Sequence, residues 1–136
     1  MQRTKILVVL AAATLLLCAC RRETKDEKFR REYVEFTQKE CPKDVNECTR
    51  MDSICYDIGS RTLTEYYTVW GLLDVDSLYT DDVLATLHDD ILKSLKSSIH
   101  LKPYKDEGIS FRYHYRSRST GRKLVELVYT RDEYGK

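Results

Sequence analysis

The sequence predicts a two-layer α+β fold, in which a four-stranded antiparallel sheet carries helices on one face. Three patterns lead to this prediction: an amphipathic helix over residues 80–99 and two hairpins over residues 49–71 and 109–130. A helical pattern also precedes the first hairpin, so the expected order of elements is α-β-β-α-β-β. Two layers let every element bury its apolar side against another.

The first helix is expected within residues 21–40. Its apolar stripe consists of Phe29, Tyr33 and Phe36. Spacings of four and three positions place these rings on one face of a helix, with charged residues around them. Cys41 should end the helix, because a residue before a proline, here Pro42, is disfavoured in the helical conformation.

The first hairpin is expected because residues 49–71 are rich in Tyr, Thr, Val and Ile, with a turn near Gly59. In its second strand, Leu63, Tyr67 and Val69 alternate with threonines. One face of this strand should therefore be buried and the other should be wet.

The second helix has the clearest pattern, and it should run from Thr80 to about residue 99. Thr80 suits the N-cap position, and Asp81 and Asp82 suit the positive end of the helix dipole. The apolar face comprises Val83, Leu84, Leu87, Ile91, Leu92, Leu95 and Ile99. We expect Leu87 and Ile91 to lie buried against the sheet.

The second hairpin should turn at residues 119–121, with Gly121 in the left-handed conformation. This loop pairs Tyr115 with Val125, Tyr113 with Leu127 and Phe111 with Tyr129 on one face. The opposite face then carries Arg112, His114 and Arg116. A slip of one residue would mix the two faces, which favours this register.

The first 20 residues resemble the signal of bacterial lipoproteins. Arg3 and Lys5 precede an apolar run at residues 6–19, which is too short to cross a hydrocarbon core that needs about 20 residues. The motif LCAC at residues 17–20 resembles the lipobox. In that family the final cysteine, here Cys20, receives a diacylglycerol, and the peptide before it is removed.

This resemblance implies a signal peptide at residues 1–19, a lipidated tether at residues 20–27 and one α+β domain at residues 28–136. The alternative is an ordinary secretory signal that leaves Cys20 as a free thiol. Arg21 stands where many lipoproteins of the inner membrane carry an Asp. We therefore expect the chain to be anchored in the cell envelope by its lipid, in the outer membrane and facing the periplasm.

Residues 42–134 also resemble a group of small, uncharacterised bacterial envelope proteins. The resemblance rests on the strand TRMDS at residues 49–53, in which Met51 replaces the usual Leu, and on the Tyr-rich strand, helix and aromatic hairpin that follow. It implies the order of elements and no activity.

Besides Cys20, the mature chain has Cys41, Cys48 and Cys55. Cys41 and Cys48 are expected to form the disulfide, because Cys48 and Cys55 would lie about 20 Å or more apart if a strand at about 3.3 Å per residue separates them. Pairing of Cys41 with Cys55 remains the alternative. No metal site is expected, because zinc ligands are usually two to four residues apart.

The second hairpin contains the one uneven distribution of charge. Its candidate anion-binding residues are Arg112, His114, Arg116, Arg118, Arg122 and Lys123. The favoured interpretation of this charge is nevertheless a solvated outer face that protects the sheet from aggregation, with anion binding as the alternative. Without residues 1–19, which hold Arg3 and Lys5, the 23 basic residues fall to 21 against 22 acidic ones. This balance gives no reason to expect nucleic acid as a partner.

We expect no catalytic residue and no cofactor, because no cysteine or histidine lies in a recognisable nucleophile motif. The function expected is that of a lipid-anchored envelope protein that binds a protein or an anionic ligand without catalysis. The alternative is a structural or assembly factor, pilotin-like or immunity-like, that acts on one protein partner. An envelope enzyme comes third.

The lipobox predicts that Cys20→Ala abolishes lipidation, since no thiol then remains at the modified position. Metabolic labelling with a radioactive fatty acid measures this directly. Labelling of the variant as strong as that of the native protein would contradict the prediction.

Overall fold

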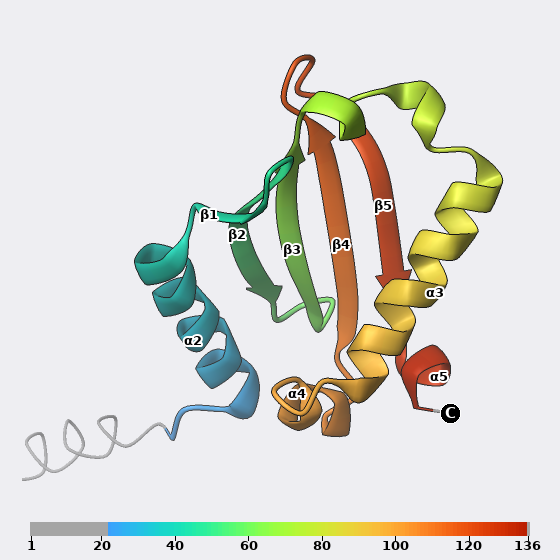
Figure 1. Cartoon of the computed structure of the whole chain (residues 1–136). Coiled ribbons are helices and arrows are strands. Elements are labelled where there is room, and N and C mark those ends of the chain that lie inside the picture. The colour runs from blue at the N-terminus through green and yellow to red at the C-terminus, as the bar shows by residue number, and fades with distance from the viewer. Residues whose placement is uncertain (1–21, 136) are drawn as a thin grey trace, which may run out of the picture.

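The computed structural model describes residues 22–135 as a five-stranded sheet, in the order β1-β2-β3-β4-β5, with its long helices on one face and short helices at one end (Figure 1). The strands are β1 (Lys43–Asn46), β2 (Thr49–Asp57), β3 (Thr62–Val69), β4 (Ser110–Ser117) and β5 (Lys123–Tyr129). The helices are α2 (Lys25–Glu40), α3 (Asp81–Ser97), α4 (Lys102–Asp106) and α5 (Arg131–Tyr134), with 3-10 turns η1 (Gly71–Leu73) and η2 (Asp76–Leu78). The expected signal peptide and Cys20 lie outside the described residues.

The sheet is mixed, so the prediction of four antiparallel strands was wrong in two respects, and the expected order α-β-β-α-β-β was wrong because it lacked β1, α4 and α5. Strand β1 adds a fifth strand at one edge, and β3 pairs with β4 in parallel, with Leu63 beside Phe111. The parallel pair follows from the length of α3. Its 17 residues span about 25 Å and return the chain along the eight residues of β3, which span about 26 Å. Strand β4 therefore starts at the same end of the sheet as β3.

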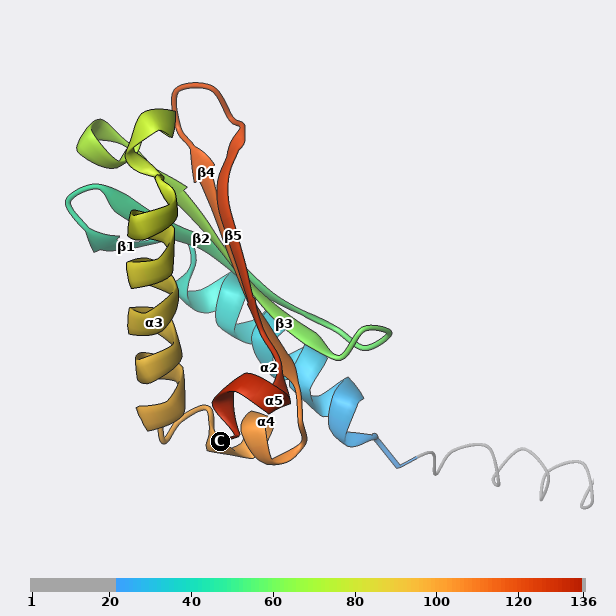
Figure 2. The same ribbon diagram turned by 90° about the vertical axis from the view of Figure 1, so that its right-hand side faces the viewer.

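Both long helices lie on one face of the sheet, as the sequence predicts (Figure 2). The buried core is formed by Phe29, Ile54, Tyr56, Leu63, Tyr67, Leu95, Ile109, Phe111, Tyr113, Tyr129 and Tyr134. Tyr134 of α5 closes one end of this core, and its hydroxyl donates to the carbonyl of Ile109 at 2.8 Å. The α+β class and the placement of the helices are thus confirmed.

The register predicted for the second hairpin is confirmed. Phe111 pairs with Tyr129, Tyr113 with Leu127 and Tyr115 with Val125. Gly121 has a φ of 69°, as predicted, but β4 ends at Ser117 and β5 begins at Lys123, so the loop is longer than the three residues expected. A bulge after Tyr115 shifts the register by one residue, so that Arg116 pairs with Lys123.

Helix α2 begins three residues before the domain boundary that we expected at residue 28. Thr24 caps it, because its side chain accepts from the backbone amide of Glu27 while the Glu27 carboxylate accepts from the amide of Thr24. Because this capping box makes Thr24 the N-cap, Lys25 is the first residue of the helix. At the other end the helix stops at Glu40, and Cys41 is its C-cap, as predicted.

A single threonine of α2 covers the free edge of β2. The Thr37 hydroxyl donates to the carbonyl of Ile54 at 2.8 Å and accepts from its amide at 2.9 Å. Strand β1 is too short to pair with this part of β2, so the amide and carbonyl of Ile54 would otherwise be unpaired at the sheet edge. Unpaired backbone groups at an edge can pair with strands of other molecules. Thr37 therefore both positions α2 and protects the edge.

Helix α3 starts as predicted but buries much less of its apolar face than we expected. Thr80 is its N-cap, and Leu95 is only 1% exposed. Leu87 and Ile91 are half-buried, however, and Val83 is exposed. The reason is that α3 meets the core mainly through its second half, where Ile91, Leu92 and Leu95 pack next to α5 (Figure 2).

This difference in burial predicts unequal costs for two leucines of one helix. Leu95→Ala should lower the free energy of unfolding by about 2–5 kcal/mol, the usual cost of a cavity in a core. Leu87→Ala should cost less than half as much, because its side chain already contacts water. Urea unfolding of both variants measures the two costs, and equal losses would show that the two positions are equally buried.

Candidate functional site

The predicted basic residues on β4 lie together on the outer face of the sheet, opposite the face that carries α2 and α3. His114 lies 3.1 Å from Glu126, and Lys123 lies 3.7 Å from the same carboxylate. The hydrogen bond from His114 and the positive charge of Lys123 hold the pKa of Glu126 below its usual value. Arg116 pairs with Asp52 at 3.3 Å, beside a pocket of about 410 Å³.

The remaining predicted residues are spread out rather than convergent. Arg122 pairs with Asp76 at 2.9 Å, and the Arg118 guanidinium lies 5.3 Å from the centre of the Trp70 ring. The Nε atom of Arg112 is buried without a hydrogen-bond partner. Four of the six basic side chains thus have an acidic partner, which offsets the charge that an anion would need. The anion-binding role stays a prediction.

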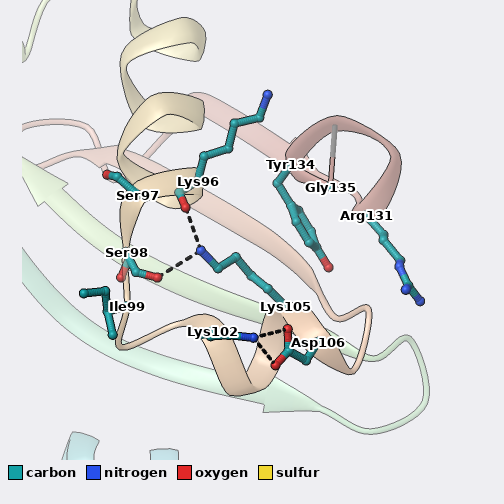
Figure 3. A pocket seen from close by; sticks show the side chains of 10 residues that line it. All are labelled: Lys96, Ser97, Ser98, Ile99, Lys102, Lys105, Asp106, Arg131, Tyr134 and Gly135. Carbon is teal, nitrogen blue, oxygen red and sulfur yellow. Dashed lines mark hydrogen bonds and ion pairs between the residues drawn. The ribbon is translucent and has the colours of Figure 1, made fainter.

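A second pocket, of about 510 Å³, lies where α3 meets α4 and α5 (Figure 3). Lys105 Nζ donates there to carbonyls at the C-terminal end of α3, those of Leu95, Lys96 and the C-cap Ser98, at 2.8, 2.9 and 2.9 Å. These are the groups that a helix C-terminus leaves unsatisfied. The side chains of Lys96 and Arg131 point away from Lys105 in Figure 3. The lysine therefore caps a helix, and the cations do not converge on a ligand.

The unexpected charged residue is Glu65, which lies on the helix-facing side of the sheet. Its register partners are Ile54 and Tyr113, both buried on that side. The hydroxyl of Tyr67 donates to its carboxylate. Burial raises the pKa of Glu65, and the bond from Tyr67 opposes that shift. Within residues 22–135 no cation pairs with this carboxylate.

Tyrosines from three elements surround Glu65. Burial raises the pKa of Tyr33 in α2, Tyr67 in β3, and Tyr113 and Tyr115 in β4, and the negative charge of Glu65 raises each of them further. The value for Tyr115 is about 12. The rings of Tyr67 and Tyr115 stack with their centres 4.9 Å apart. The carboxylate is therefore set among phenol rings.

The helices leave this part of the sheet only partly covered. Helix α2 lies beside β2 and α3 lies beside β5, and none of the helices of residues 22–135 crosses the middle of β3 and β4 between them (Figure 1). We call this surface the inner face; its half-buried members include Met51, Glu65, Tyr115 and Leu127 of the sheet and Leu84 and Leu87 of α3.

Sequence reasoning missed Glu65, although a signal was present. The residue stands between Leu63 and Tyr67 in the strand whose alternation was recognised, so it occupies a core-facing position. A charged residue in such a position is unusual unless it is paired.

The three cysteines of the domain are free thiols in the structure. Strand β1 lies between Cys41 and Cys48 and spans about 10 Å at 3.3 Å per residue, more than the separation of about 7 Å that a disulfide tolerates. Their pairing stays a prediction, and it would require β1 to shift. Residues 22–135 contain no group of three potential metal ligands. None of their helices is long and apolar enough to span a membrane.

Comparison with known families identifies the class of protein. Residues 24–125 match the family described as "Domain of unknown function (DUF8479)", and the chain belongs to that family. No curated protein matches the sequence.

Three solved structures share the fold. A Pseudomonas aeruginosa protein, described as a "putative secreted protein", superposes with a TM-score of 0.65 at 10% identity, over 84% of this chain and 99% of that one. The type II secretion system pilotin AspS of Vibrio cholerae superposes with a TM-score of 0.57 at 13% identity, over 82% and 94%. The type 2 pilotin EpsS of Vibrio vulnificus gives 0.58 at 12% identity, over the same shares.

The raised pKa of Glu65 predicts that Glu65→Gln stabilises the protein at pH 7. A carboxyl whose folded pKa lies above its ordinary value of 4.5 binds its proton more tightly in the folded state than in the unfolded state. The free energy of unfolding therefore falls as the pH rises from 4.5 through the folded pKa of Glu65. The advantage of the Gln variant should therefore disappear as the pH falls toward 4.5.

Glu126→Gln is the matched control, because its pKa is lowered rather than raised. This variant should lose stability at pH 7, and the loss should shrink as the pH falls below 4.5. Urea unfolding at several pH values measures both. A Glu65→Gln variant that is less stable than the native protein at pH 7 would refute the assignment.

Proposed function

We propose that this protein is a lipid-anchored, non-catalytic assembly factor of the cell envelope that binds one protein partner. The sequence predicts this function as the alternative to general ligand binding. The fold shared with two secretion-system pilotins supports it, because their sheet and helices superpose on those of this chain. The resemblance of residues 1–20 to a lipoprotein signal supports the anchor.

The proposed anchor would hold the domain close to a membrane. Lipidation at Cys20 leaves four residues before α2 begins at Lys25. At about 3.5 Å per residue these span at most about 14 Å. We place the anchor in the outer membrane with the domain in the periplasm, on the ground that Arg21 follows the cysteine.

The observation that carries the proposal is the incomplete cover of the inner face. Leu84 and Leu87 belong to the helical stripe that ends in the buried Leu95, yet both remain half-exposed. Apolar surface of this kind, next to half-buried tyrosines, marks an interaction site in a soluble domain. On the outer face the exposed Val128 and Tyr66 instead stand beside charge-compensated pairs such as His114 with Glu126.

The proposal predicts that Leu87→Asp releases the partner. The full-length lipidated protein would be purified by affinity from detergent-solubilised envelopes and its stoichiometric partner quantified. The Leu87→Asp variant should lose that partner, because a carboxylate would be buried in the apolar contact. Val128→Asp, on the outer face, should retain it.

Thermal unfolding of both variants controls for folding, and their midpoints should stay within a few degrees of each other. Retention of the partner by Leu87→Asp would contradict the proposal. Its loss from Val128→Asp alone would move the binding site to the outer face.

A further inference from the structure

Glu65 presents one carboxylate oxygen that the fold does not use. Its Oε2 accepts from the Tyr67 hydroxyl, whereas Oε1 has no hydrogen-bond partner within residues 22–135. Oε1 is not fully buried, so it keeps contact with solvent. A partly buried carboxylate that has no cation beside it, next to a half-buried apolar surface, can form an ion pair with a cationic side chain of another molecule.

We propose that the inner face binds an apolar segment of the partner protein that carries a lysine or arginine, and that this cation pairs with Glu65 Oε1. The inference rests on the proposed function and adds the chemistry by which the partner is recognised. The apolar part of the segment contacts Leu84 and Leu87 of α3. Its cation enters between α2 and α3, over β3 and β4.

The surroundings of Glu65 favour an ion pair because the carboxylate is largely desolvated. Tyr67 donates its hydroxyl to Oε2, and its ring stacks on that of Tyr115 with centres 4.9 Å apart. The negative charge of Glu65 also raises the pKa of Tyr33 and Tyr113, which shows that both lie near it. In such a partly buried setting a charge–charge attraction is stronger than in water.

The same carboxylate argues against other occupants. An acyl chain on the inner face would cover Glu65 without pairing it, and an unpaired buried charge is costly. A second copy of this chain would have to bring a basic side chain on an apolar surface. Helix α3, the most apolar exposed element, carries Lys93 and Lys96 near Leu92, so self-association is an outcome that the test must separate.

The dimensions of the inner face set the length of the segment. Helix α3 is 17 residues long and spans about 25 Å. A partner helix of about 16 residues, or an extended segment of about eight, would match this span.

The test uses the full-length lipidated protein in detergent micelles and a displayed library of random 16-residue peptides. Peptides selected on the native protein should be apolar and contain at least one lysine or arginine. Glu65→Gln should weaken their binding about tenfold or more, the size expected for a hydrogen bond to a charged group. Glu126→Gln removes a carboxylate from the outer face and should change their binding less than twofold.

A charge exchange makes the test specific. Peptides in which norleucine replaces the basic residue should bind the native protein about tenfold more weakly and should lose nothing further on Glu65→Gln. Selection on Glu65→Lys should enrich peptides with an acidic residue at the same place. Failure of either expectation would overturn the inference.

The outcomes separate this inference from the proposed function. Binding that depends on Leu87 but is unchanged by Glu65→Gln would overturn the role of Glu65 and leave the proposed function standing. Binding that Leu87→Asp does not change would overturn both. No selected peptide, a dimer that Leu87→Asp dissociates, or phospholipid that competes for the inner face would each overturn the inference.

Discussion

The rest of the structure depends on the parallel pairing of β3 with β4. Each hairpin alone has one apolar side, and the pairing places Leu63 beside Phe111 and Tyr67 beside Tyr115, so that the two sides become one surface. Helix α3 makes this pairing possible because it carries the chain back along the sheet. The same crossover brings Glu65 against Tyr113, which means that the candidate site is a consequence of the topology rather than of any local motif.

Glu65 shows how stability and function separate in this domain. The carboxylate is desolvated, its pKa is raised, and no cation among residues 22–135 offsets its charge. Gln at this position would keep the bond to Tyr67 without the charge. A residue that costs stability in the free protein is explained if it contributes to binding, since a partner's cation would supply the missing attraction. The outer face is the opposite case, because His114 and Arg116 already have their acidic partners.

Local sequence patterns predicted much of the fold, whereas features that depend on contacts between distant parts of the chain were missed. The cap at Thr80, the end of α2 at Cys41 and the register of Tyr113 with Leu127 depend on neighbouring residues, and all three were predicted. The parallel pair was missed because periodicity says nothing of strand direction. The exposure of Leu87 was missed because it depends on where α5 holds α3. Glu65 could have been found from its place in the alternation, but its lack of a cation could not.

Site-specific crosslinking in intact cells tests the central claim most directly, that the inner face binds a protein partner. A photoreactive benzoylphenylalanine would replace Leu87 in the full-length protein, with Val128 as the matched outer position. The account predicts that Leu87 crosslinks to one envelope protein, through a segment that is apolar and contains a basic residue, and that Val128 does not. Crosslinks from Leu87 to lipid alone, or equal crosslinks from both positions, would contradict it.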